Sequence, residues 1–237
     1  MQRLPLFSHL LLSRLSPFLH PSTVLLAIPP RSYYLSTNSP PSQTALLADY
    51  RATLTHARAA YPTSKLVLYG HSLGAAGACC LLASIPSPST STPRLVDALI
   101  LENPFPSVPA MIEESLYPSK WLPYHYLTPF VLDRWDALAG LQASTGDRSD
   151  ARPSELDRTR VLFVSAEGDT LVKPELVRRM AEVARGDLAE REWLSIKDRS
   201  HDDAWMAKRD WGDGVRTFLV KAGVLDSGEP VRPRRQT

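Results

Sequence analysis

Short aliphatic runs alternate with longer amphipathic segments along most of the chain. Runs of strand type occupy residues 24–28, 65–69, 96–101, 161–165 and 192–196. Helical spacing of apolar positions, or a run of small residues behind a turn, predicts helices over residues 44–60, 73–84, 175–184 and 211–221. Strands that alternate with helices predict an α/β fold, with a mostly parallel sheet covered by helices on both faces.

The chain of 237 residues fits one α/β domain, which we expect over residues 1–222. A segment rich in proline and aromatic residues, 105–135, interrupts the alternation of strands and helices. We expect it to be a cap-like insertion over the carboxyl edge of the sheet. Residues 223–237, with several arginines and prolines, predict a disordered tail.

Charge and cysteine usage exclude several classes of protein. The 27 basic and 25 acidic side chains give a net charge of +2, too small to indicate a nucleic-acid partner. The two cysteines, Cys79 and Cys80, are neighbours and form no disulfide framework, which favours an intracellular location. No stretch reaches the roughly 18 apolar residues that cross a bilayer. We expect no metal and no cofactor, and the sequence leaves the oligomeric state open.

Residues 70–74 read Gly-His-Ser-Leu-Gly and form the clearest chemical signal in the chain. This G-x-S-x-G motif follows a predicted strand and precedes a predicted helix, which is the context of a nucleophile elbow. Ser72 is the expected nucleophile, and the backbone N–H of Leu73 is the expected oxyanion donor. Gly70 and Gly74 are expected to remove Cβ atoms that would clash in the tight turn.

A serine nucleophile needs a base that a carboxylate orients, in the chain order serine, acid, histidine. Asp169 follows a predicted strand and a glycine, and His201 follows the last predicted strand, so they are the expected acid and base. Glu102 also ends a strand and stays an alternative acid. The remaining histidines lack this context, and we expect the His71 side chain to pack against neighbouring loops.

Several segments together resemble the α/β-hydrolase superfamily and, more narrowly, its bud-emergence branch, to which abhydrolase domain-containing protein 13 belongs. These segments are RSYYLS, LVLYGHSLG, LILENPFPSVPAM, DRWD, SAEGDTLV and SHDDAW, in family order along nearly the whole chain. The resemblance implies a serine hydrolase that cleaves carboxylic esters or thioesters. Relatives include lipid lipases and protein depalmitoylases, often attached to membranes, so a peripheral membrane contact is also implied.

Two departures from the family pattern change this picture. The glycine-rich R-G-Y-G-x-S loop reads Arg-Ser-Tyr-Tyr-Leu-Ser at residues 31–36, which predicts a different backbone path. The H-G-N-A-G-type loop is absent, so the resemblance implies that the first strands and the oxyanion-loop strand are missing and that the chain is truncated. The first 48 residues lack Asp and Glu, as mitochondrial presequences do, but we favour a core strand over residues 24–28.

Two hypotheses from different classes follow. The first is an enzyme in which Ser72 attacks an acyl carbonyl, His201 moves the proton and Asp169 orients His201. In this enzyme, an acyl pocket is lined by aromatic residues of the segment from Tyr117 to Phe130, which include Trp121, Tyr124 and Tyr126, or these residues form a flap packed on the core. The second is a catalytically impaired or inactive binding protein on a hydrolase scaffold, because an oxyanion donor is lost. Within the enzyme class, protein depalmitoylation is the alternative to lipid or small-ester hydrolysis.

Overall fold

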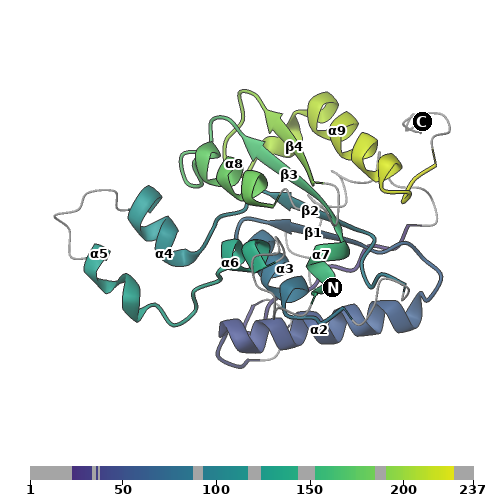
Figure 1. Ribbon diagram of the computed structural model, residues 1–237, viewed down its shortest axis with the longest axis horizontal. Helices are drawn as coiled ribbons and strands as arrows, with labels where there is room; N and C mark the ends of the chain where they lie inside the picture. The colour runs from purple at the N-terminus through teal and green to yellow at the C-terminus, as the bar shows by residue number, and fades with distance from the viewer. Residues whose placement is uncertain are drawn as a thin grey trace, which may run out of the picture.

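The computed structural model describes residues 23–33, 36, 38–87, 93–116, 124–143, 153–184 and 191–226. The strands among these residues form one parallel sheet in the order β1-β2-β3-β4 (Figure 1). The strands are β1 (Val67–His71), β2 (Ala98–Glu102), β3 (Arg160–Ala166) and β4 (Arg191–Ile196). The four corresponding aliphatic runs are therefore confirmed as strands, each within a few residues of its predicted bounds.

Successive side chains of a strand point to opposite faces of the sheet, and an apolar cluster covers each face here. In β2, which is buried along its whole length, Leu99 and Leu101 join one apolar cluster, whereas Ala98 and Ile100 join the other. In β3, Val161 and Phe163 join the first cluster, whereas Leu162 and Val164 join the second. Such runs without polar alternation are typical of parallel strands with helices on either side.

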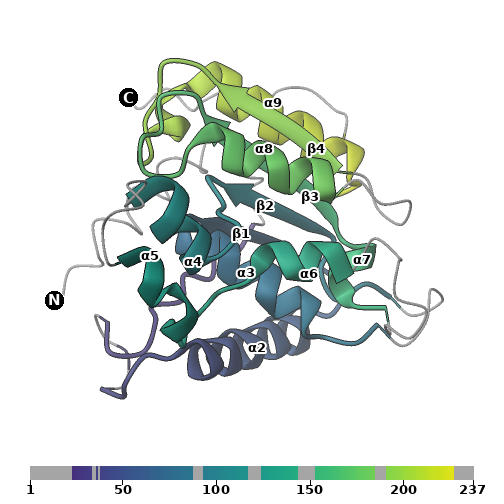
Figure 2. The same cartoon turned by 60° about the vertical axis from the view of Figure 1, so that its left-hand side comes forward.

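The helices are distributed unequally over the two faces (Figures 1 and 2). One cluster contains side chains of α2 (Gln43–Ala60), α3 (Leu73–Ala83), α6 (Ala137–Ala143), α7 (Glu155–Arg158) and α8 (Pro174–Val183). The other contains side chains of α9 (Lys208–Lys221) and of the short η3 (Ala204–Met206). Ser42 caps α2 by accepting from the N–H of Ala45, and Pro174 opens α8 at a position where its missing N–H costs nothing. None of the described helices is both long and apolar enough to span a bilayer.

The segment between β2 and α6 contains short helical elements. They are α4 (Val108–Met111), the π-helix η1 (Ile112–Leu116), α5 (Tyr124–Leu127) and the 3-10 helix η2 (Thr128–Phe130). Glu114 forms an ion pair of 2.8 Å with Arg179 of α8, and its carbonyl accepts from Lys173 at 2.6 Å. These two contacts fix η1 beside the loop that connects β3 to α8.

Residues 24–28 do not form the core strand that the sequence predicts. They pair with no described strand, and Val24, Leu26 and Ile28 are 53%, 43% and 41% exposed. A strand is stable only when a neighbour satisfies its N–H and C=O groups, and Pro29 and Pro30 directly after the run supply no N–H. Residues 1–22, where a presequence was the other interpretation, lie outside the described residues.

The loop that follows this run has a left-handed backbone at a residue that is not glycine. Ser32, at the position of the first family glycine, has a φ of 66°. Its hydroxyl accepts from the N–H of Ser39, and Arg31 forms an ion pair of 2.6 Å with Asp49 of α2. Ser32 thus adopts a left-handed conformation, which non-glycine residues adopt at a cost.

The first residues of the predicted tail pack against α9. The N–H groups of Val224 and Leu225 donate to the carbonyl of Leu219 at 2.9 and 3.2 Å, and both side chains pack against the α9 cluster. Residues 223–226 thus continue the end of α9, and the rest of the predicted tail, 227–237, lies outside the described residues.

Candidate active site

Ser72 occupies the turn between β1 and α3 in a strained backbone conformation. Its φ of 52° and ψ of −118° lie outside the regions that L-residues prefer. The N–H of Ser72 donates to the carbonyl of Glu102 at 2.9 Å, while its own carbonyl accepts from Ala75 and Ala76 at 3.0 and 3.1 Å. These hydrogen bonds fix the turn between the sheet and the helix, so the strain is held in place from both sides.

Gly70 is required by the close approach of β1 to the first turn of α3. A Cβ at this position would lie 2.5 Å from the carbonyl oxygen of Gly74 and 2.7 Å from the backbone of Ala75. Both are backbone atoms, which have no rotamer with which to move away. The predicted steric role of Gly70 therefore agrees with the geometry.

The same prediction is wrong for Gly74. Apart from its chain neighbours and the backbone of α3, a Cβ added there would meet no described atom within 4 Å, and Gly74 has no positive φ and is exposed in α3. Only its carbonyl oxygen takes part in the close approach, and every residue has one. The motif is therefore symmetric in sequence but not in its steric demands.

The first turn of α3 offers a backbone donor beside Ser72. Among the described residues, no acceptor lies in hydrogen-bonding position for the N–H of Leu73. The first N–H groups of a helix have no partner within the helix, and the helix dipole places partial positive charge there. This end of α3 therefore suits negative charge that develops next to Ser72.

Asp169 is buried in the loop after β3 and is held by three hydrogen bonds. Its Oδ1 accepts from the N–H groups of Leu171 and Val172, each at 2.8 Å, which fixes the orientation of the carboxylate. Its Oδ2 lies 2.7 Å from Nδ1 of His201. The two sequence-predicted residues, 32 positions apart in the chain, are thus in direct contact.

The loops that carry Asp169 and His201 also touch through their backbones. The N–H of Gly168 donates to the carbonyl of Arg199 at 2.8 Å. A Cβ on Gly168 would approach that carbonyl oxygen to 2.8 Å, so only glycine fits there without a shift. Asp203 accepts from the N–H and the hydroxyl of Ser200, which closes the turn before His201.

The environment of His201 raises its pKa above the ordinary value. Burial of the imidazole lowers the pKa, but the hydrogen bond and charge of Asp169 together with the carboxylates of Asp202 and Glu102 outweigh it. The raised pKa means that His201 is protonated up to a pH above its usual titration range. As pH rises through this raised pKa, the imidazole becomes a neutral base, while the stabilisation of the fold by the protonated ring is lost.

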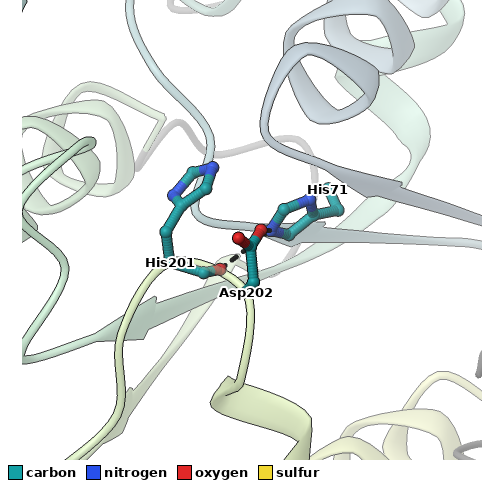
Figure 3. Close-up of side chains that lie close together, drawn as sticks. All are labelled: His71, His201 and Asp202. Carbon is teal, nitrogen blue, oxygen red and sulfur yellow. Dashed lines mark hydrogen bonds and ion pairs between the residues drawn. The ribbon is translucent and has the colours of Figure 1, made fainter. Parts of the chain in front are cut away.

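His201 lies beside the turn of Ser72. The ring of His71, the residue before Ser72, is 4.8 Å from the His201 ring between centroids, and Figure 3 shows both rings with Asp202. Within the described residues, the Ser72 hydroxyl makes no hydrogen bond to the His201 imidazole. In enzymes without substrate, such bonds are often long and shorten only in the reacting complex.

The alternative acid, Glu102, belongs to another contact. It is fully buried, and its Oε2 accepts from the hydroxyl of Tyr69 and from Nε1 of Trp211, each at 2.8 Å. Trp211 is part of α9, so the carboxylate is directed to the face of the sheet that α9 covers. Glu102 therefore acts on His201 only through its charge, and Asp169 holds the position that an orienting acid requires.

Three side chains near the site have the composition of a metal centre. In the described part of the chain, potential ligand atoms of His71, His201 and Asp202 lie within 4.8 Å of one another. However, Nδ1 of His201 contacts Asp169, and Nε2 of His71 contacts the His201 carbonyl at 2.9 Å. Metal-bound histidines make the same contacts through the nitrogen that does not hold the ion, and a triad base uses its remaining nitrogen for the serine, so by its contacts the cluster fits either role.

The predicted aromatic lining is only partly described. Tyr117 and Trp121 lie outside the described residues, as do the side chains of Tyr124 and His125. Tyr126 and Phe130 are 72% and 76% exposed and do not pack on the core. Closer to the site, Leu73 and Leu171 are exposed beside Ser72 and Asp169, and the Ser115 hydroxyl of η1 donates to the carbonyl of Leu171.

The sequence matches no family model and no curated protein, but its fold is similar to that of solved enzymes. A puromycin hydrolase aligns with a TM-score of 0.56 and 16% identity over 79% of this chain and 27% of its own. An esterase of Pyrococcus furiosus aligns at 0.52 and 16% identity, over 78% and 65% of the two chains. An esterase of Thermogutta terrifontis aligns at 0.51 and 18% identity, over 80% and 68%.

The chain has the α/β-hydrolase fold. It spans about a quarter of the puromycin hydrolase and about two thirds of the two esterases. At 16–18% identity these neighbours establish the arrangement of strands and helices and no more.

Proposed function

We propose that the protein is a serine hydrolase that cleaves carboxylic esters or thioesters through an acyl-enzyme on Ser72. The observation that carries the proposal is the 2.7 Å contact between Asp169 and His201, next to the strained turn of Ser72. A buried acid that orients a histidine beside a strained serine is the arrangement of a catalytic triad. The hydrolase fold of the neighbours supports the same assignment.

The proposed reaction has two halves, acylation and then deacylation of Ser72. The Ser72 Oγ attacks the acyl carbonyl carbon while Nε2 of His201 takes the hydroxyl proton. When the tetrahedral intermediate collapses, the bond from carbon to the leaving oxygen or sulfur breaks, and His201 returns the proton to the leaving alcohol or thiol. In the second half, water attacks the acyl carbon while His201 takes its proton, the bond from carbon to Ser72 Oγ breaks, and His201 returns the proton to Oγ as the carboxylic acid leaves.

Asp169 and Leu73 stabilise the charges that form in these steps. The Asp169 carboxylate holds His201 in the Nδ1–H form and stabilises the imidazolium that follows proton transfer. The N–H of Leu73, strengthened by the dipole of α3, donates to the oxyanion. Removal of one oxyanion donor typically costs about 100- to 1,000-fold in turnover. The turnover of this protein therefore depends strongly on a second donor beside the N–H of Leu73.

The substrate class is proposed from the apolar side chains around the site. The exposed Leu73 and Leu171 favour an acyl chain that is apolar. Lipid and small esters come first, and protein thioesters, as in depalmitoylation, come second. Peripheral contact with a membrane stays a prediction, which the exposed Tyr126, Leu127, Phe130 and Leu132 support.

Segment similarity supports a narrower placement in the family. We propose membership of the bud-emergence branch on the segments LILENPFPSVPAM and SHDDAW, which contain Asn103 and His201. Both segments lie at the carboxyl edge of the sheet, where the branch is expected to differ from other hydrolases.

A fluorophosphonate probe tests the proposed function directly, because it reacts with activated serines. We expect the wild-type protein to be labelled and the Ser72→Ala variant not to be labelled. Hydrolysis of p-nitrophenyl butyrate and of an S-acyl thioester should be lost in the same variant. A folded wild-type protein that is neither labelled nor active would favour the binding-protein alternative, and unchanged labelling of Ser72→Ala would reject Ser72.

A further inference from the structure

The backbone carbonyl of His201 contacts two side-chain nitrogens. Nδ2 of Asn103 donates to it at 2.8 Å. Nε2 of His71 lies 2.9 Å from it, and Figure 3 shows His71 and His201 side by side. A carbonyl oxygen only accepts hydrogen bonds, so the His71 nitrogen must carry a proton in this contact. The two donors come from the ends of β1 and β2, 130 and 98 residues before His201 in the chain.

Asn103 is held rigidly by contacts on its other sides. It is fully buried directly after β2, in a left-handed conformation with a φ of 46°. Its backbone N–H donates to the carbonyl of Val164 at 2.8 Å, and its Oδ1 accepts from the N–H of Ala166 at 2.9 Å. The side-chain amide therefore connects the end of β3 to the loop of His201, using its acceptor on one side and its donor on the other.

His71 connects the same carbonyl to the nucleophile turn. It is the last residue of β1 and directly precedes Ser72, so its position is set by the pairing of β1 with β2. Its side chain is only 13% exposed, with Nε2 4.0 Å from the carboxylate of Asp202. The hydrogen bond to His201 is thus a link between the loop of the proposed base and the strand that carries the proposed nucleophile.

We propose that His71 and Asn103 are positioning residues that fix the reach of His201 toward both Ser72 and Asp169. This inference rests on the proposed function, since it assigns the pair a role only if His201 is the base. Hydrogen bonds to the carbonyl of His201 restrict its backbone, so the Cα atom from which the imidazole extends is held in place. A displacement of about 1 Å at a reacting group can cost about 100-fold in rate, so two donors on this carbonyl matter for turnover.

The test compares His71→Leu, which removes the donor, with His71→Gln, which keeps an N–H donor on a side chain of similar length. For p-nitrophenyl butyrate hydrolysis, we expect His71→Leu to lower kcat about 10- to 100-fold while KM changes less than about 3-fold. His71→Gln should recover most of the loss. Thermal unfolding of both variants separates these effects from a loss of fold.

The pH profile supplies a readout that a merely structural role would not move. Asp169 helps to raise the pKa of His201, so a loosened His201 should titrate at lower pH. The acid limb of kcat/KM should therefore shift to lower pH in His71→Leu and return toward the wild-type position in His71→Gln. A wild-type kcat and acid limb in folded His71→Leu, or equal impairment of the Leu and Gln variants, would overturn the proposal.

Asn103→Asp is a second, independent variant. Aspartate keeps the size, the acceptor for Ala166 and the tolerance of a left-handed φ, but it replaces the donor by an oxygen that faces the His201 carbonyl. We expect a loss of kcat at least as large as that of His71→Leu, and a wild-type kcat would contradict the role of Asn103. Ser72→Ala, measured in parallel, separates the two proposals: activity in that variant rejects the proposed function, whereas its inactivity beside a fully active His71→Leu rejects only the positioning role.

Discussion

The carboxyl edge of the sheet and the segment 23–33 show two different outcomes for sequence patterns of similar strength. At the edge, the loops after β2, β3 and β4 are held together by hydrogen bonds between distant residues, as Asn103, Asp169 and His201 illustrate. In residues 24–28, an aliphatic run typical of a core strand is exposed and pairs with no described strand. The apolar pattern of a segment thus predicts that it can form a strand, and a neighbouring strand in the folded chain decides whether it does.

The largest expected effect tests the edge of the sheet through Asp169→Asn. The amide keeps an oxygen for the N–H groups of Leu171 and Val172, so the loop should fold, but it no longer holds His201 in the correct tautomer. We expect kcat to fall about 10,000-fold, or about 5.4 kcal/mol in barrier height. Steady-state kinetics on p-nitrophenyl butyrate measures the effect.

Asp202→Asn is the matched control for this prediction. Asp202 is adjacent to His201 in sequence but its side chain is 86% exposed, and solvent screens its charge. We expect kcat to change less than about 3-fold. If the two aspartates proved equally important, the orienting role would not belong to Asp169 alone.

A smaller effect separates the two glycines of the nucleophile turn. Gly70→Ala places a Cβ within 2.7 Å of the backbone of α3, so we expect it to lower the free energy of unfolding by about 3 kcal/mol and to reduce labelling of Ser72. Apart from its chain neighbours and the backbone of α3, the Cβ of Gly74→Ala meets no described atom, and the variant replaces an exposed glycine in a helix, so we expect a gain of about 0.5–1 kcal/mol. Chemical denaturation of both variants checks the difference, and equal destabilisation would restore the symmetric interpretation of the motif.

The sequence predicts the strands and the principal helices because their apolar runs are long and are bounded by turns. It misses α7 (Glu155–Arg158), which has too few residues for a periodic pattern. This helix depends instead on a capping box between Ser154 and Asp157 and on Arg191, which donates to the carbonyl of Leu156 at 2.9 Å. The contact from Arg191 joins residues 35 positions apart and leaves no local signal, whereas the pair of Ser154 and Asp157 is local but too short a pattern to show that a helix follows.

The same reasoning explains what the sequence reveals of the site. Asp169 and His201 follow strands in a fixed chain order, so local pattern and topology together bring them to one edge. Asn103 was missed because an asparagine after a strand looks like an ordinary turn residue. Its function depends on the His201 carbonyl, 98 positions away, and on a left-handed backbone that only the folded chain reveals.

The smallest expected effect tests the exposed segment against the core. Leu99→Ala in β2 removes a fully buried side chain and should cost about 2–5 kcal/mol in the free energy of unfolding. Leu26→Ala removes the same atoms from a side chain that is 43% exposed, so we expect a change within about 0.5 kcal/mol. Urea denaturation of the two variants measures both values. A cost above about 2 kcal/mol for Leu26→Ala would mean that residues 24–28 are buried in solution, as a core strand would be, and that the difference between the two regions is smaller than their exposure indicates.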